Sequence, residues 1–457
     1  MSTKIPVDPL IAIVGATGTG KSKLAIELAQ RFNGEIINGD AMQMYKGLPI
    51  ITNKVSEAEK QNIPHHIFDQ IGLEDQPWTV SNFRREAHKA IGEIRSRGRL
   101  PILVGGTHYY TKAVLFNDYL LTGEGASSGS EDDSRERFPI LEAPTTEILA
   151  KLREVDPKIA SRWHPLDRRK IRRSLEIWLQ TGKTASQTYE EQSQRRLSMR
   201  ACGPSDGNDS CLKYSSLIFW LRAKDDVLKR RLNNRVDAML ECGLIQEAQA
   251  ISQAERSLNA AGIQINKAKG IWASIGYKET EPYISALADT SKTLGELEAI
   301  KATCIEAAKG ATRRYARRQE RWIRTHFSDA LTESDAMDTL YPIDCTNPDE
   351  WDTNVNQPVT DITESFLAGN PRPTPESLSD MAREAISAIK AELEHGNVRE
   401  CRYCEVCDKT LMTEKEWTAH LRSNTHKKAL AGRKRWEAFK AWQARQGAAE
   451  EHRKNDE

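Results

Sequence analysis

The sequence predicts an α/β protein in which a parallel sheet is covered by helices on both faces. A short apolar stretch at residues 10–15 runs into a glycine-rich turn and then into the helical spacing of Leu24 and Leu28. This unit recurs along the chain, with further apolar strands expected at 34–40, 98–107 and 216–223. Alternating strands and helices are typical of parallel sheets that are buried on both faces.

The length and charge of the chain limit the classes of protein to which it can belong. A chain of 457 residues is long enough for two or three domains and at least one large core. Its 66 lysine and arginine residues nearly balance its 65 aspartate and glutamate residues, so no overall positive field indicates a nucleic-acid partner and local charge has to be examined. No apolar run approaches the roughly 20 residues that cross a bilayer, so we expect no membrane association.

We expect the protein in a reducing compartment, because its cysteines show no disulfide framework. Only residues 1–9 precede the first strand, which leaves no room for a cleaved signal or a transit peptide. The sequence therefore predicts a cytoplasmic protein and leaves a nuclear or mitochondrial share open.

A phosphate-binding loop follows the first strand. Gly15, Gly20, Lys21 and Ser22 match the motif GxxxxGK[ST], with a strand before it and a helix after it. In such loops backbone N–H groups approach phosphate oxygens, the lysine neutralises charge and the serine is placed to ligate Mg²⁺. The residues that we expect to bind a diphosphate in this loop are Gly15, Ala16, Thr17, Gly18, Thr19, Gly20, Lys21 and Ser22.

Polar residues also follow the other strands, namely Asp40, Thr107 and Arg222. Because ligands of open parallel sheets bind outside the carboxyl ends of the strands, we expect these residues to face one crevice with the phosphate loop. The residues leave three roles open for Asp40: an acid that holds magnesium for phosphoryl transfer, a general base opposite a leaving diphosphate, or a helix cap.

Four metal-ligand residues lie near the C-terminus. Cys404 and Cys407 precede His420 and His426, which gives CxxC, twelve residues and HxxxxxH. This is the spacing of a tetrahedral Cys2His2 site, so we expect a structural Zn²⁺ ion there.

Two segments, 162–173 and 301–324, carry many more basic than acidic residues, and the second contains Tyr315 and Trp322. Such segments contact phosphates, and aromatic rings stack on unpaired bases. A charge run is also often only a solvated helix face, so the residues alone leave both interpretations open.

Seven blocks occur in the order found in the tRNA dimethylallyltransferases, also called tRNA isopentenyltransferases: "GATGTGKS", "GDAMQMYKG", "LVGGTHYY", "HPLDRRKIRRSLEIW", "RVDAML" with "GLIQEAQ", "GIWASIGYKE" and "RRYARRQERWIR". The sequence resembles this family from about residue 10 to residue 326, and the finger after that resembles the eukaryotic branch. One departure is Ala41, where the family usually has serine.

The resemblance implies transfer of a dimethylallyl group from dimethylallyl diphosphate to the exocyclic amine of the adenosine immediately 3′ of the tRNA anticodon. It implies that Asp40 is the general base, that Thr107 contacts tRNA, and that Lys21, Mg²⁺ and either Arg222 or Arg235 take up charge on the departing diphosphate. The residues that it implies for binding the anticodon stem-loop are Asp40, Ala41, Met42, Gln43, Thr107, Arg169, Lys170, Ile171, Arg172, Arg173, Arg314, Arg318 and Gln319.

Together these features predict a P-loop NTPase-like sheet, a helical insertion domain and a small zinc finger, in a protein that we expect to be a monomer. The catalytic core is expected in two parts, 1–121 and 213–326, and the second part includes tRNA-binding helices. An acidic hinge and a helical insertion are expected between them at 122–212. The remaining expected segments are an acidic linker and helix at 327–398, the zinc finger at 399–430 and a basic tail at 431–457. The residues alone leave two other functions open: a P-loop kinase or ATPase, and a non-catalytic RNA-binding zinc-finger protein.

Overall fold

The computed structural model describes residues 5–117, 138–201, 212–394 and 399–455. Apart from Phe138, the acidic hinge expected at 122–138 lies outside the described residues. The chain divides into two compact units, one made of residues 1–119 and 199–393 and the other of residues 120–198 and 394–457. Each unit is described by itself.

The first unit is built on a six-stranded sheet in the order β3-β2-β4-β1-β5-β6, in which every pair of neighbours is parallel. The strands are β1 (Pro9–Gly15), β2 (Gly34–Asn38), β3 (His65–His66), β4 (Leu100–Val104), β5 (Ser215–Arg222) and β6 (Leu340–Asp344). The four predicted strands are confirmed as β1, β2, β4 and β5. Strands β3 and β6 were not predicted.

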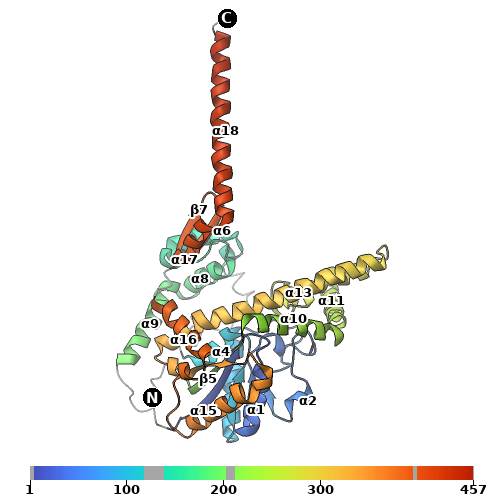
Figure 1. The fold of residues 1–457 in the computed structure, drawn as a ribbon, viewed down its shortest axis with the longest axis vertical. Helices are drawn as coiled ribbons and strands as arrows, with labels where there is room; N and C mark the ends of the chain where they lie inside the picture. Colours follow the sequence, from blue (N-terminus) through green and yellow to red (C-terminus); the bar gives the residue numbers. More distant parts are fainter. Residues whose placement is uncertain (1–4, 118–137, 202–211, 395–398, 456–457) are drawn as a thin grey trace. The chain divides into compact units, whose positions relative to one another are not determined.

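Alternate residues of the strands point to opposite faces of the sheet, as the pleat requires, and each face has its own core. Leu10 and Ala12 of β1 belong to the core that includes side chains of α3 (Val80–Ser96), α4 (His108–Leu115) and α16 (Asp380–Glu394). Ile11 and Ile13 belong to the core on the other face, with side chains of α1 (Lys21–Arg31) and α15 (Gln357–Leu367). Helices therefore cover both faces, as predicted (Figure 1).

The first unit also contains the helices α10 (Asp225–Glu241), α11 (Leu244–Ala260), α12 (Tyr277–Leu287) and α13 (Leu294–Trp322). Helix α13 packs against α12, and it also packs against α10, which lies along it in Figure 1. It begins at a capping box, in which Thr293 accepts from the N–H of Glu296 and the Glu296 carboxylate accepts from the N–H of Thr293. Helix α13 carries Tyr315 and Gln319 to the ends of the strands.

The segment expected at 327–398 as an acidic linker and a helix contains that helix as α16, but the part before α16 is not a linker. This earlier part contains α14 (Ser328–Glu333), β6 and α15, and β6 pairs with β5 as the last strand of the sheet. Leu340, Tyr341 and Ile343 of β6 are buried. Strand β6 lies among acidic residues, so the composition of the segment obscures its apolar positions. The other expected domain boundaries remain a proposed division.

The second unit contains helices α6 (Thr145–Val155), α7 (Pro157–Ala160), α8 (Arg168–Thr181) and α9 (Ala185–Ala201), with α6 to α8 around a small core of their own. It also contains the antiparallel pair β7 (Arg399–Cys404) and β8 (Lys409–Thr413), followed by α17 (Glu414–Arg422) and α18 (Asn424–Asn455). The short elements of the two units are η1 (Met42–Met44), α2 (Glu57–Lys60), η2 (Pro139–Glu142), η3 (Gly270–Ala273), η4 (Ile323–Phe327), η5 (Met337–Thr339), η6 (Pro348–Glu350), η7 (Asp352–Asn356) and η8 (Pro375–Ser377). Among the described residues, no helix combines the length and the apolar character needed to cross a membrane.

Candidate active site

The phosphate loop lies between β1 and α1 and is closed by its own hydrogen bonds. Thr19 Oγ1 and Lys21 Nζ each donate to the carbonyl oxygen of Ala16, at 2.8 Å. Gly20 has a φ of +89° and caps α1, a conformation that favours glycine. Gly15 is required for space, because a Cβ there would lie 2.5 Å from the carbonyl oxygen of Leu221. The loop therefore has the form that presents backbone N–H groups to an anion.

Lys21 is the positively charged residue of the phosphate loop itself. Its burial lowers the pKa of the ammonium from the usual value to about 8, and Asp40 opposes this shift. A partly desolvated ammonium interacts strongly with an anion that enters the same site. Lys21 is thus suited to hold a diphosphate that enters the site.

Asp40 lies directly after β2. Its Oδ1 accepts from the backbone N–H of Met42 at 3.0 Å, and burial raises the pKa of the carboxyl while Lys21 and the two backbone N–H groups of Met42 and Gly106 lower it. Because Met42 is the first residue of η1, the hydrogen bond to Asp40 Oδ1 also satisfies the N-terminal N–H of that short helix, which begins after Ala41. A carboxylate whose pKa is raised is a stronger base than an exposed aspartate.

Gln319 of α13 joins the phosphate loop to the end of β4. Its Oε1 accepts from the N–H of Thr17, and its Nε2 donates to the carbonyl oxygen of Gly106, both at 2.8 Å. The residue is buried, so both ends of the amide are satisfied within the protein. Gln319, which the resemblance implies for tRNA binding, therefore holds backbone in this structure.

Gly106 lies where Asp40 and Gln319 approach the end of β4. A Cβ at this position would lie 2.6 Å from Gln319 Nε2 and 2.8 Å from Asp40 Oδ2. We therefore expect Gly106→Ala to lower the rate of the reaction at this site by about 10²-fold, because a small misplacement of reacting groups costs about that much. Gly92→Ala is the matched control, since a Cβ on Gly92 of α3 meets nothing within 4 Å. Equal single-turnover rates for the two variants would contradict this expectation.

Thr107 links the ends of β2 and β4. Its Oγ1 accepts from the N–H of Ala41 at 3.0 Å, and its own N–H donates to the carbonyl oxygen of Gly39 at 3.2 Å. Gln43, also near this edge, donates from Nε2 to the carbonyl oxygen of Asn53 at 2.9 Å. The segment that contains Asp40 is thereby held on both sides.

Arg222 and Arg235, the two alternatives for taking up charge on the diphosphate, lie in different surroundings. Arg235 of α10 donates to Thr17 Oγ1 at 2.9 Å, so it contacts the phosphate loop. Arg222 at the end of β5 donates from Nε to Glu320 at 2.6 Å and lies over the Trp220 ring. The structure therefore brings Arg235 to the loop, whereas Arg222 is engaged by Glu320, a partner that sequence reasoning missed.

The expected tRNA-binding residues of α8 do not all face outward. Arg169, Lys170 and Arg173 are exposed, Arg172 pairs with Glu142 at 3.3 Å, and the side chain of Ile171 is fully buried in the core of the insertion. The side chain of Ile171 thus packs in the core of the insertion and does not face outward. On α13, in the other unit, Arg314 and Arg318 are both exposed.

The expected zinc ligands come together. Each of Cys404, Cys407, His420 and His426 offers one ligand atom, and these four atoms lie within 4.8 Å of one another. The sulfur atoms of Cys404 and Cys407 lie 3.6 and 3.4 Å from His426 Nδ1. Zinc bonds of about 2.0–2.3 Å in a tetrahedron place ligands roughly this far apart, so the four residues fit Zn²⁺.

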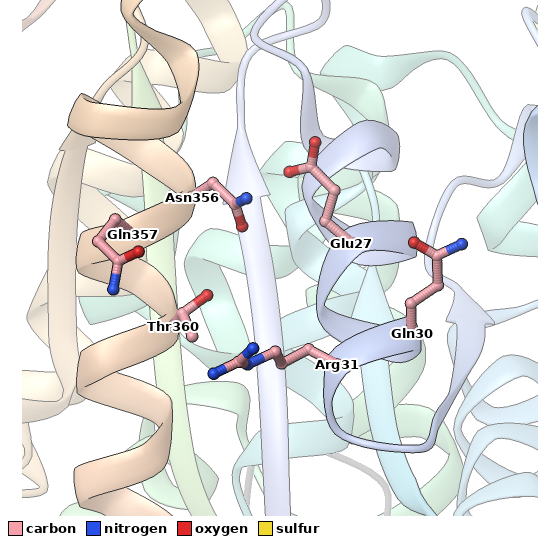
Figure 2. Close-up of a pocket in the computed structure, with 6 residues that line it drawn as sticks. All are labelled: Glu27, Gln30, Arg31, Asn356, Gln357 and Thr360. Atoms are coloured by element: carbon pink, nitrogen blue, oxygen red, sulfur yellow. The ribbon is translucent and has the colours of Figure 1, made fainter.

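A polar groove lies between α1 and the facing residues of η7 and α15 (Figure 2). The groove is open to solvent and is lined by Glu27, Gln30, Arg31, Asn356, Gln357 and Thr360. Arg31 there pairs with Glu364 at 2.9 Å. Because it contains none of the loop residues, we assign it no part in the chemistry.

The fold and the site define a class of protein: a P-loop protein of the α/β type with a Cys2His2 finger. An arginine and a glutamine contact its loop, and an aspartate and a threonine follow the neighbouring strands. Residues 43–326 match the family model of the IPP transferases, and residues 402–426 match the zinc finger of C2H2 type. The chain belongs to the tRNA dimethylallyltransferase family.

Individual relatives agree with this assignment. The chain is 34% identical to the tRNA dimethylallyltransferase of Saccharomyces cerevisiae, over 95% of this chain and 94% of that protein. It is also 34% identical to the human protein of the same name, over 93% and 87% of the two chains. A crystal structure of a eukaryotic dimethylallyltransferase acting on tRNA superposes with a TM-score of 0.76 at 33% identity, covering 96% of this chain and all of that one.

Proposed function

We propose that this protein transfers the dimethylallyl group of dimethylallyl diphosphate to the exocyclic amine of the adenosine immediately 3′ of the tRNA anticodon. The observation that carries the proposal is the position of Asp40 between the phosphate loop and the end of β4, with Lys21 close enough to act on its charge. A kinase would also need the phosphate loop. In the family to which the chain belongs, however, the aspartate acts as the general base for an amine.

The roles of the residues follow from bond changes in the reaction. The amine nitrogen forms a bond to the allylic carbon while the bond from that carbon to the diphosphate oxygen breaks. Asp40 takes the proton that the amine loses, and Lys21 and Arg235 take up the charge that develops on the leaving diphosphate. Ser22 is the residue that would hold Mg²⁺, which supplies further stabilisation of the same charge.

The adenosine has to leave the stack of the anticodon loop before its amine can reach Asp40. The exposed Arg314 and Arg318 on α13, the helix whose Gln319 contacts the phosphate loop, support binding of the tRNA backbone near the crevice. The exposed basic residues of α8 are proposed to contact the same stem-loop. The anticodon stem-loop is thus proposed as the partner.

Nucleoside mass spectrometry tests the proposal. Purified protein is incubated with unmodified tRNA, dimethylallyl diphosphate and Mg²⁺, and the digested tRNA is examined for isopentenyladenosine. ATP replaces dimethylallyl diphosphate in a parallel reaction. Hydrolysis of ATP with inert dimethylallyl diphosphate would indicate a kinase or ATPase, and tRNA binding without any turnover would indicate a non-catalytic RNA-binding protein.

The finger and α18 are proposed to add tRNA affinity without supplying catalytic groups. Their basic residues include Lys427, Lys428, Lys434 and Arg435. Deleting residues 399–457 is therefore expected to raise the KM for tRNA and to flatten its dependence on salt, because each lost phosphate contact removes one released counterion. The kcat at saturating tRNA should stay within about twofold, as expected when binding energy is lost equally from ground and transition states.

Cys404→Ser gives a narrower version of this test, since it removes a zinc ligand from the full chain. It should lower the zinc content measured by atomic absorption and raise the KM for tRNA in the same direction. A collapse of kcat in either variant would mean that the finger helps to build the active site.

A further inference from the structure

The segment that follows residues 43–326 reaches the phosphate loop through one aromatic side chain. Trp351 lies between η6 and η7, and a Cβ built on Gly20 would come within 2.6 and 2.8 Å of two carbons of its ring. Gly20 is the residue from which α1 begins. The ring therefore covers the loop at the start of the phosphate-binding helix.

Trp351 is also bound to the following turns of α1. Its indole Nε1–H donates to the two carboxylate oxygens of Glu27, at 3.1 and 2.9 Å, and Lys23 Nζ lies 4.5 Å from the ring centroid. The side chain is only 8% exposed. One ring thus contacts the N-cap and the first two turns of α1, at Gly20, Lys23 and Glu27.

The residues before and after Trp351 are fixed to the core. The guanidinium of Arg231 donates to the carbonyl oxygens of Cys345 and Thr346, each at 2.9 Å, just after β6 ends. After Trp351, Val355 and Val359 are fully buried in the same core as the apolar side of α1. The ring is therefore held by structure on both sides and cannot simply follow a movement of the loop.

We propose that Trp351 is a positioning residue for the diphosphate, which fixes Gly20 and the first turns of α1 so that the N–H groups of Lys21 and Ser22 are held where the diphosphate binds. Gly20 lacks a Cβ and has large conformational freedom, and a rigid neighbour on its open side removes that freedom before the ligand arrives. The proposal rests on the proposed function, which it deepens by naming a segment beyond residue 326 that completes the diphosphate site.

Two substitutions in the full-length protein test this role. We expect Trp351→Ala to raise both the Kd of inorganic pyrophosphate with Mg²⁺, measured by calorimetry without tRNA, and the KM for dimethylallyl diphosphate by about tenfold, as for one weakened charge-assisted hydrogen bond. The KM for tRNA should change by less than about twofold, because Trp351 touches the loop and not the basic surfaces. Trp351→Phe should give a smaller rise, since it keeps a ring on Gly20 but loses the hydrogen bond to Glu27.

Ile362→Ala is the matched control for general loss of stability. Ile362 is buried in α15 within the same core as Trp351. Its truncation should lower the Tm while leaving the Kd of pyrophosphate unchanged. An unchanged Kd in Trp351→Ala, or an equal rise in Ile362→Ala, would overturn the assignment of Trp351.

These outcomes are separate from the test of the proposed function. A wild-type protein that makes no isopentenyladenosine would refute the function whatever the Trp351 variants do. A wild-type protein that modifies tRNA and binds pyrophosphate, with both Trp351 variants unchanged, would refute only the role of Trp351.

Discussion

Asp40→Asn is expected to lower the single-turnover rate of dimethylallyl transfer by about 10²–10⁴-fold, the range found when a general base is removed. The amide keeps an oxygen that can accept from the N–H of Met42, so the local backbone should persist. The affinity for tRNA should stay within a few-fold, because one neutralised carboxylate removes no phosphate contact. The measurement is rapid-quench kinetics with enzyme in excess over radiolabelled tRNA.

The dependence of this rate on pH provides an independent check. Burial raises the pKa of Asp40 above that of an ordinary aspartate, and only the unprotonated carboxylate accepts a proton. The wild-type rate should therefore fall as the pH is lowered through this raised pKa, at a higher pH than an exposed aspartate would give. Asp40→Asn should lack this acidic limb. A near-normal rate in the variant, or the same acidic limb, would remove Asp40 from the mechanism.

The parts of the fold that the sequence predicts are those whose apolar runs are followed by turn residues. Strands β1, β4 and β5 are nearly continuous apolar runs, because parallel strands are buried on both faces. Strand β2 has only two large apolar residues, Ile36 and Ile37, and is followed by Gly39 and Asp40. Strand β6 is buried like these strands and, at five residues, is as long as β2 and β4, but it lies among acidic residues that suggest a linker. Strand β3 has only two residues, His65 and His66, which no periodicity can reveal.

In the candidate site, too, residues placed by the local sequence pattern could be predicted, whereas contacts between residues far apart in the chain could not. The positions of Asp40 and Thr107 follow from the rule that ligands bind outside the carboxyl ends of parallel strands. The choice between Arg222 and Arg235 depended on Glu320, which lies about one hundred residues away and carries no local signal. Trp351 could not be found for a similar reason, since its contact with Gly20 joins segments more than three hundred residues apart in the chain.

Lys21→Ala is expected to lower kcat/KM for dimethylallyl diphosphate by about 10²–10³-fold, the loss typical of removing one group that stabilises charge in the transition state. Both kcat and KM should change, because the lysine acts on the bound diphosphate and more strongly on the charge that grows as it leaves. Steady-state kinetics at saturating tRNA measure both constants. A variant in which only KM rises would mean that Lys21 binds the substrate without stabilising its departure.

The pKa of Lys21 makes this prediction specific. In the free enzyme the ammonium has a pKa of about 8, so kcat/KM for dimethylallyl diphosphate should fall as the pH rises through that value and the lysine becomes neutral. The bound diphosphate favours the charged form, so the same limb in kcat should lie at higher pH. Lys21→Arg keeps a charge at every accessible pH and should lack the alkaline limb, whatever its absolute rate. An alkaline limb near pH 8 that persists in Lys21→Arg would assign the titration to another group and leave the charge of Lys21 without a role in the pH profile.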